Sequence, residues 1–194
     1  MSDRGGLRLV CALALGLVGA NVAVKPGLAP VDTRRVSDTV RRSREWRGRV
    51  APPFEVPLLD GGVVRADAPE FDLTVLMFVT TWCDECGDEM TEVRRYQQRL
   101  PAEGLRVRVV VIDTQEEADD VRAFARRHGL PTTVAMDASG DVMRAYEVRT
   151  YPTTVVVARD GRVRLFHEGP VRNADVVIDP VVRVELGIGR PPQP

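Results

Sequence analysis

The feature that most limits the fold is an uncharged apolar run, Leu73–Val79, followed at once by residues with helical spacing. A short unbroken run of this length is typical of a buried strand. Apolar residues then recur every three or four positions and predict one face of a helix that ends near Pro101 and Gly104. These residues are Cys86, Met90, Val93, Tyr96 and Leu100. A strand that leads directly into a helix indicates an α/β arrangement.

The same alternation continues along the chain and closes with a hairpin. The predicted elements are strands at Val107–Ile112 and Leu130–Met136, helices at Glu116–His128 and Asp141–Tyr146, and hairpin strands at Thr153–Ala158 and Val163–Phe166. Arg159-Asp160-Gly161 supplies the hairpin turn, and a last helix is expected to begin at Asp179-Pro180. The pattern predicts an α/β sandwich over residues 51–188, with a mixed central sheet flanked by helices.

Composition excludes several classes of function. The chain has 194 residues, 44% of them hydrophobic, and a formal net charge of −1. Such a chain suits one domain with extensions, and it shows no basic excess for nucleic-acid binding. Three cysteines do not make a disulfide scaffold. A zinc site is disfavoured because there is no second C-x-x-C, and His128 and His167 lie far in sequence from the Cys83–Cys86 pair. We therefore expect a monomer without a cofactor or metal.

The first 29 residues have the character of an export segment. Arg4 and Arg8 precede an uncharged run, Leu9–Val24, which is typical of a signal peptide or an N-terminal membrane anchor. Both alternatives stay open, and both predict a periplasmic or other extracytoplasmic location. Residues 30–50 contain seven arginines. Positive residues just beyond a translocated segment are unusual, so this composition counts against the export prediction. We expect a solvated tether there with a short helix near Val36–Trp46, and a disordered proline-rich tail at 189–194.

Two cysteines occur where a thiol is most easily activated. Cys83 and Cys86 follow the Leu73–Val79 strand and begin the next helix. A helix N-terminus stabilises a thiolate, so Cys83 is the expected nucleophile and Cys86 the thiol that resolves a mixed disulfide. Trp82 is expected to offer a flat contact surface to a partner. A four-residue loop gains little from closure, which favours redox chemistry over structural stapling.

Three segments carry a resemblance to a known family. They are FVTTWCDEC at Phe78–Cys86, VRTYPTTVVVARDGRV at Val148–Val163, and a lead-in hairpin PPFEVPLLDGG at Pro52–Gly62. Together with Glu89 they resemble the thioredoxin superfamily, and most closely its exported TlpA/ResA-like thiol–disulfide reductases, from about Ala51 to Gly169.

The resemblance implies several roles. Pro152 would follow a cis peptide bond, and Thr150, Tyr151 and Pro152 would bind an extended segment of a protein substrate beside the cysteines. Glu89 would handle protons. A membrane thiol transporter is implied as electron donor, and cytochrome c maturation as one pathway.

The chain also departs from the family. Asp84 and Glu85 stand between the cysteines, where a proline is common in the second place, and Gly87 replaces a usual basic residue. Two carboxylates beside Cys83 should disfavour its thiolate, which suggests a more reducing couple and hence a reductase. Two alternatives remain: a binding module with an inert disulfide, and a thiol peroxidase. Thr80 precedes Cys83 by three residues as in peroxiredoxins, although Leu76 replaces their proline.

Overall fold

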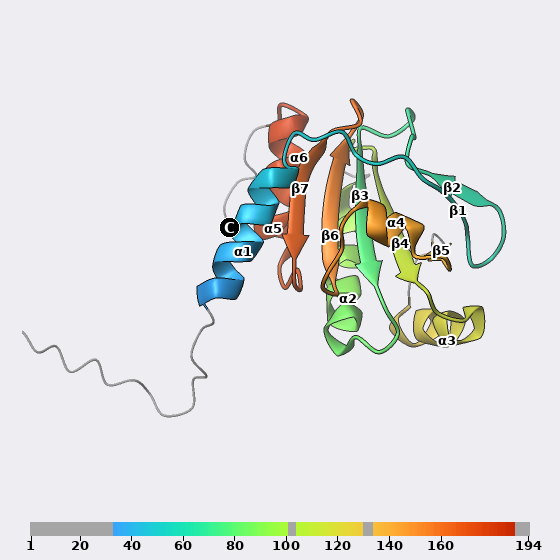
Figure 1. Ribbon diagram of the computed structural model, residues 1–194. Coiled ribbons are helices and arrows are strands. Elements are labelled where there is room, and N and C mark those ends of the chain that lie inside the picture. The colour runs from blue at the N-terminus through green and yellow to red at the C-terminus, as the bar shows by residue number, and fades with distance from the viewer. Residues whose placement is uncertain (1–32, 101–103, 130–133, 189–194) are drawn as a thin grey trace, which may run out of the picture. The chain divides into compact units, whose positions relative to one another are not determined.

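The computed structural model of the chain describes residues 33–100, 104–129 and 134–188. A five-stranded sheet forms its centre, with the strand order β5-β4-β3-β6-β7 (Figure 1). The strands are β3 Leu73–Val79, β4 Val107–Thr114, β5 Val134–Asp137, β6 Thr153–Ala158 and β7 Val163–Glu168. Strands β3, β4 and β5 are parallel, whereas β6 is antiparallel to both β3 and β7. The predicted mixed sheet is therefore confirmed.

Helices cover both faces of the sheet. One face carries α2 Asp84–Arg99, α3 Ala118–His128, α5 Ala174–Val177 and α6 Asp179–Glu185, whose apolar residues share one core cluster. The other face carries α1 Thr33–Trp46, α4 Asp141–Ala145 and the hairpin of β1 Glu55–Pro57 and β2 Val63–Arg65. In Figure 1, α4 lies in front of the sheet and α2 behind it. Both faces of β3 are covered, which explains why all seven of its residues are buried.

Most predicted elements are present, with small shifts at their ends. The lead-in hairpin is β1–β2, and Gly61 and Gly62 in its turn have φ of 98° and 86°, which only glycine adopts easily. Helix α5 was not predicted; it is four residues long, and its N-cap is Asn173, whose side chain accepts a hydrogen bond from the Asp175 N–H. The expected segments at 1–29 and 189–194, and the first part of the Leu130–Met136 strand, lie outside the described residues.

The expectation of a solvated tether at 30–50 is wrong for its second half. Helix α1 ends at Trp46, which is 2% exposed and stacks on Phe166 and Tyr146 with ring centroids 5.1 Å and 5.9 Å away. Arg42 is also buried, and its Nε lies 2.9 Å from Oε1 of Glu168 at the end of β7. One aromatic and one paired arginine fix the helix to the domain, and an arginine-rich composition does not reveal them. Helix α1 is therefore part of the packed domain.

Within these described ranges, no helix combines the length and the apolar character that crossing a membrane requires. The apolar run Leu9–Val24, on which the export prediction rests, lies outside them.

We predict that Trp46→Ala lowers the free energy of unfolding by about 3–5 kcal/mol, because it empties a site packed between two aromatic rings. Arg44→Ala is the matched control: this exposed residue of the same helix should change stability by less than about 0.5 kcal/mol. Urea denaturation of both variants gives the comparison. Equal stabilities would mean that α1 does not pack as described.

Candidate redox site

The two cysteines lie at the junction of β3 and α2. Cys83 is the N-cap of α2, and its Sγ accepts a hydrogen bond from the Cys86 backbone N–H at 3.2 Å. The two sulfurs form a disulfide, with an S–S distance of 2.10 Å. Cys83 is 8% exposed and Cys86 is 0% exposed. The first cysteine is thus largely buried, but it is the one of the two that a partner can reach.

The segment that contains Pro152 lies beside this junction. The Tyr151–Pro152 peptide bond is cis, as the resemblance implied. Strands β3 and β6 are antiparallel with Phe78 opposite Thr153, so Pro152 lies at the end of the sheet from which the chain continues to Cys83. The rings of Trp82 and Tyr151 meet edge to face, with centroids 5.8 Å apart. A direct contact therefore joins two predicted site residues that are far apart in the sequence.

This segment leaves backbone groups available to a partner. Thr150 is exposed, and its carbonyl accepts a hydrogen bond from the Thr153 hydroxyl at 2.8 Å. The Pro152 carbonyl accepts from the Gly169 N–H, whereas the N–H and C=O of Tyr151 make no hydrogen bond to any described residue. Trp82 is 70% exposed, an unusual position for so large a ring. Unpaired backbone beside an exposed aromatic ring is what strand addition by a peptide requires.

Glu89 lies one helical turn beyond Cys86 on α2 and is 1% exposed. Burial raises its pKa from 4.5 to about 7. A hydrogen bond of 2.6 Å from the Thr154 hydroxyl and the nearby Val171 N–H act in the opposite direction. The second carboxyl oxygen, Oε2, has no hydrogen-bond partner of normal geometry among the described residues. A buried carboxyl group that titrates near neutrality can both donate and accept a proton.

The two residues between the cysteines differ in their surroundings. Asp84 and Glu85 are both exposed in the first turn of α2. Glu85 pairs with Arg172 at 3.0 Å, and this cation offsets part of its charge.

The sequence analysis missed two residues that contact the predicted acids: Thr154, which binds Glu89, and Arg172, which binds Glu85. The position of Thr154 at the start of β6, two residues after Pro152, was one available indication, whereas no such indication existed for Arg172.

Gly87 now has a physical explanation. A Cβ atom at this position would lie 2.3 Å from Cε1 of His128, at the end of α3. The His128 ring also packs on Phe124, with centroids 4.5 Å apart. The missing side chain therefore lets α3 pack closely against the first turn of α2, just beyond Cys86.

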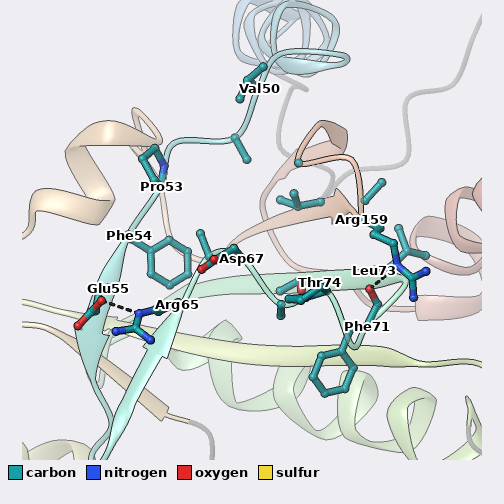
Figure 2. A pocket seen from close by; sticks show the side chains of 17 residues that line it. Val50, Pro53, Phe54, Glu55, Arg65, Asp67, Phe71, Leu73, Thr74 and Arg159 are labelled. Carbon is teal, nitrogen blue, oxygen red and sulfur yellow. Dashed lines mark hydrogen bonds and ion pairs between the residues drawn. The ribbon is translucent and has the colours of Figure 1, made fainter.

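The larger cavity is not at the cysteines. A cavity of about 840 Å³ lies at the start of β3 and the end of β6, the opposite end of the sheet. Figure 2 shows Phe54 and Phe71 at its sides and the Arg65–Glu55 ion pair at its rim. Beside Glu89 there is only a hollow of about 230 Å³. Among the described residues, no group of His, Cys, Asp or Glu is arranged to hold a metal ion.

Comparison with known proteins agrees with this geometry. The profile of the AhpC/TSA family matches residues 47–166, well over half of the chain. The chain belongs to this family. Within it, the resemblance to ResA-like proteins of the thioredoxin fold is confirmed by the relatives.

Several curated relatives are named thiol-disulfide oxidoreductase ResA. That of Bacillus thuringiensis subsp. konkukian is 28% identical over 60% of this chain, and the match spans 66% of the relative's length. That of Geobacillus thermodenitrificans is also 28% identical, over 66% of this chain and 73% of the relative.

Two solved structures are also similar. A Chlorobium tepidum protein assigned as thiol:disulfide interchange protein DsbE has a TM-score of 0.65 and 28% identity, covering 73% of this chain and 98% of that one. A secreted Mycobacterium tuberculosis disulfide oxidoreductase, at a TM-score of 0.56 and 23% identity over 70% and 96% of the two chains, shows the shared fold.

We predict that Glu89→Gln gains stability relative to the wild type as the pH rises. A carboxyl pKa that is raised in the folded state contributes stability below pH 4.5 and loses it as the pH passes about 7. At about 1.4 kcal/mol per pH unit, the loss approaches about 3 kcal/mol, and glutamine escapes it. Urea denaturation of the oxidised proteins between pH 4.5 and 8.5 measures the difference.

Asp88→Asn is the control for this measurement, because it removes an exposed carboxylate from the same turn of α2. Its stability difference from the wild type should vary little with pH. A difference between Glu89→Gln and the wild type that stays constant from pH 4.5 to 8.5 would contradict the raised pKa.

Proposed function

We propose that this chain is a thiol–disulfide oxidoreductase that reduces disulfides in protein substrates outside the cytoplasm. The observation that carries the proposal is the placement of the Cys83–Cys86 pair at the start of α2, in contact through Trp82 with the cis-Pro152 segment. Cys83 is the accessible sulfur of the pair. An accessible sulfur, a buried neighbour and a peptide-binding segment together are what thiol–disulfide exchange requires.

The reaction is two successive exchanges. The Cys83 thiolate attacks one sulfur of the substrate disulfide and forms a mixed disulfide, while the other substrate sulfur leaves as a thiolate. Cys86 loses its proton and attacks Sγ of Cys83, which releases the second substrate sulfur. The substrate has then gained two electrons and the chain holds the disulfide that the structure shows. An external dithiol must reduce the chain for the next cycle.

Glu89 is suited to the proton transfers of the second exchange. It lies three residues after Cys86, on the same face of α2, where side chains one turn apart are neighbours. With a pKa of about 7 it can accept the Cys86 proton as that thiol attacks, and return it when the pair is reduced. Thr154 holds one carboxyl oxygen in place through its hydroxyl group.

The substrate is a protein segment rather than a small molecule. The redox pair opens onto a surface with an exposed indole ring and a small hollow, whereas small-molecule sites enclose most of their ligand. Tyr151 offers its unpaired N–H and C=O to an extended chain, which would add beside Pro152 like a further strand.

Two acidic residues favour reduction over oxidation. Strong oxidants of this chemistry stabilise the reduced form of their pair as a thiolate. Asp84 and Glu85 place negative charge beside Cys83 and oppose this thiolate, although Arg172 offsets part of the Glu85 charge. Asp84, which forms no ion pair with any described residue, should therefore contribute most to the tuning.

The location and the electron donor follow from the sequence and the resemblance. Arg4 and Arg8 before the apolar run Leu9–Val24 support export, with this run either cleaved as a signal peptide or retained as an anchor in the inner membrane. An oxidising compartment cannot supply electrons by itself, so a membrane thiol transporter is the proposed donor. Cytochrome c maturation is the proposed pathway.

We predict that the full chain accelerates insulin reduction by dithiothreitol, and that Cys83→Ser abolishes the acceleration because the attacking sulfur is lost. Cys11→Ser is the control: it removes the third cysteine and should leave the rate unchanged. Precipitation of the insulin B chain, followed by turbidity, measures the rate. Equal rates for wild type and Cys83→Ser would favour a binding module, and rapid consumption of hydrogen peroxide would favour a peroxidase.

We also predict that the wild-type couple is reducing, and that the double variant Asp84→Asn/Glu85→Gln is more oxidising because it removes the two charges that oppose the thiolate. Equilibration with glutathione mixtures of defined ratio gives both potentials. Asp120→Asn, an exposed acid in the first turn of α3, serves as the control. A wild-type potential near about −120 mV would identify an oxidant instead.

A further inference from the structure

A second buried acid lies near the redox loop, on a different strand from any residue used so far. Asp113, near the end of β4, is 1% exposed and stands opposite Val79 at the end of β3. Neither of its carboxyl oxygens accepts a hydrogen bond from any donor among the described residues. A buried carboxylate without a donor is costly, so its presence requires an explanation.

The explanation involves Glu116, three residues further along the chain. One Glu116 oxygen accepts a hydrogen bond from the Thr81 backbone N–H and the other accepts from the Thr81 hydroxyl, both at 2.6 Å. Thr81 is followed directly by Trp82 and Cys83. Glu116 therefore holds the loop that ends at the attacking sulfur.

A hydrogen bond with the Glu116 carboxyl group is one of the causes that raise the pKa of Asp113. Two ionised carboxylates have only acceptors, so a hydrogen bond between them needs one shared proton. Burial, followed by the hydrogen bond to Glu116 and the charge of Glu116, raises the pKa of Asp113 to about 8. At neutral pH the proton therefore belongs to Asp113, and Glu116 is its acceptor.

In the described part of the chain, no cation acts on Asp113 to offset the charge that it would carry when ionised. Strand β3 presents Val79, β5 presents Met136, and the cluster on this face includes Val121 and Phe124 of α3. Glu116 is the one charged group that acts on Asp113 among the described residues. The acids in the first turns of α2 and α3 are exposed; they are Asp84, Glu85, Asp119 and Asp120.

The pair also acts on the substrate-binding segment. Burial raises the pKa of Tyr151, and the negative charges of Asp137, Asp113 and Glu116 raise it as well. The carboxyl pair is thus within electrostatic range of the ring that contacts Trp82. The charge of the carboxyl pair can therefore affect the redox loop in two ways: through the hydrogen bonds between Glu116 and Thr81, and through its electrostatic effect on Tyr151.

We propose that Asp113 is a positioning residue of the redox site, and that the proton it shares with Glu116 keeps the loop from Thr81 to Cys83 in its substrate-binding arrangement. This inference rests on the proposed function for its catalytic consequence. When Asp113 ionises, its buried charge faces the half-buried carboxylate of Glu116, and repulsion drives Glu116 away from Thr81. The loop is then released, and Trp82 and Cys83 lose their fixed orientation toward Tyr151.

Asp113→Asn tests the proposal because asparagine has nearly the same shape, cannot ionise and can donate to Glu116. We expect the wild-type rate of insulin reduction, divided by the thiolate fraction of Cys83, to fall at least threefold as the pH rises through about 8. Asp113→Asn should keep its low-pH rate across this range. Glu116→Gln should move the midpoint to lower pH, because it removes the charge that opposes ionisation of Asp113. Glu117→Gln, the exposed neighbouring acid, should retain the wild-type profile.

A second measurement does not depend on activity. Trp82 fluorescence in the oxidised protein, taken as the difference between the wild type and Trp82→Phe, should change with a midpoint near 8 in the wild type and not in Asp113→Asn. The same transition in both proteins would overturn the inference. An inactive wild type that still shows the Asp113-dependent transition would refute the proposed function alone.

Discussion

The geometry of the site depends on the hydrogen bond between the Cys86 N–H and Sγ of Cys83. At the start of a helix the backbone N–H groups have no partner within the helix, and here one of them points at the sulfur that a partner can reach. Strand β3 fixes this helix start because it is buried on both faces and paired on both edges. The position of the Cys83 sulfur therefore depends on a strand whose residues are all buried.

The same strand brings the other site residues together. Its antiparallel neighbour, β6, begins just after Pro152 and carries Thr154, which binds Glu89. Its parallel neighbour, β4, carries Asp113 at the corresponding end. The redox pair thus stands between two buried acids on different elements, and burial is the main reason that both pKa values are raised toward neutrality.

Local sequence patterns predicted the individual strands and helices, because these depend mainly on residues close together in the sequence. The Leu73–Val79 run matches β3, and the three-and-four spacing after Cys86 matches α2. The contacts that complete the site join residues far apart in sequence, such as Thr81 with Glu116 and Glu85 with Arg172. No spacing rule predicts such pairs, because they depend on which loops meet once the sheet has formed. The packing of α1 was missed for the same reason. It depends on the contacts of Trp46 with Tyr146 and Phe166 and on the Arg42–Glu168 ion pair, all of which join distant parts of the chain.

The buried acids also explain why the first turn of α2 is packed so tightly. Ionising a carboxyl group away from water is unfavourable, so any opening of the site that admits water lowers its pKa. Gly87 lets the His128 ring lie against α2 just beyond Cys86, with Phe124 behind it. Close packing on this side, and Val171 and Thr154 beside Glu89, leave the Glu89 side chain only 1% exposed. The close packing around α2 therefore helps to keep the pKa of Glu89 near neutrality, which its role in proton transfer requires.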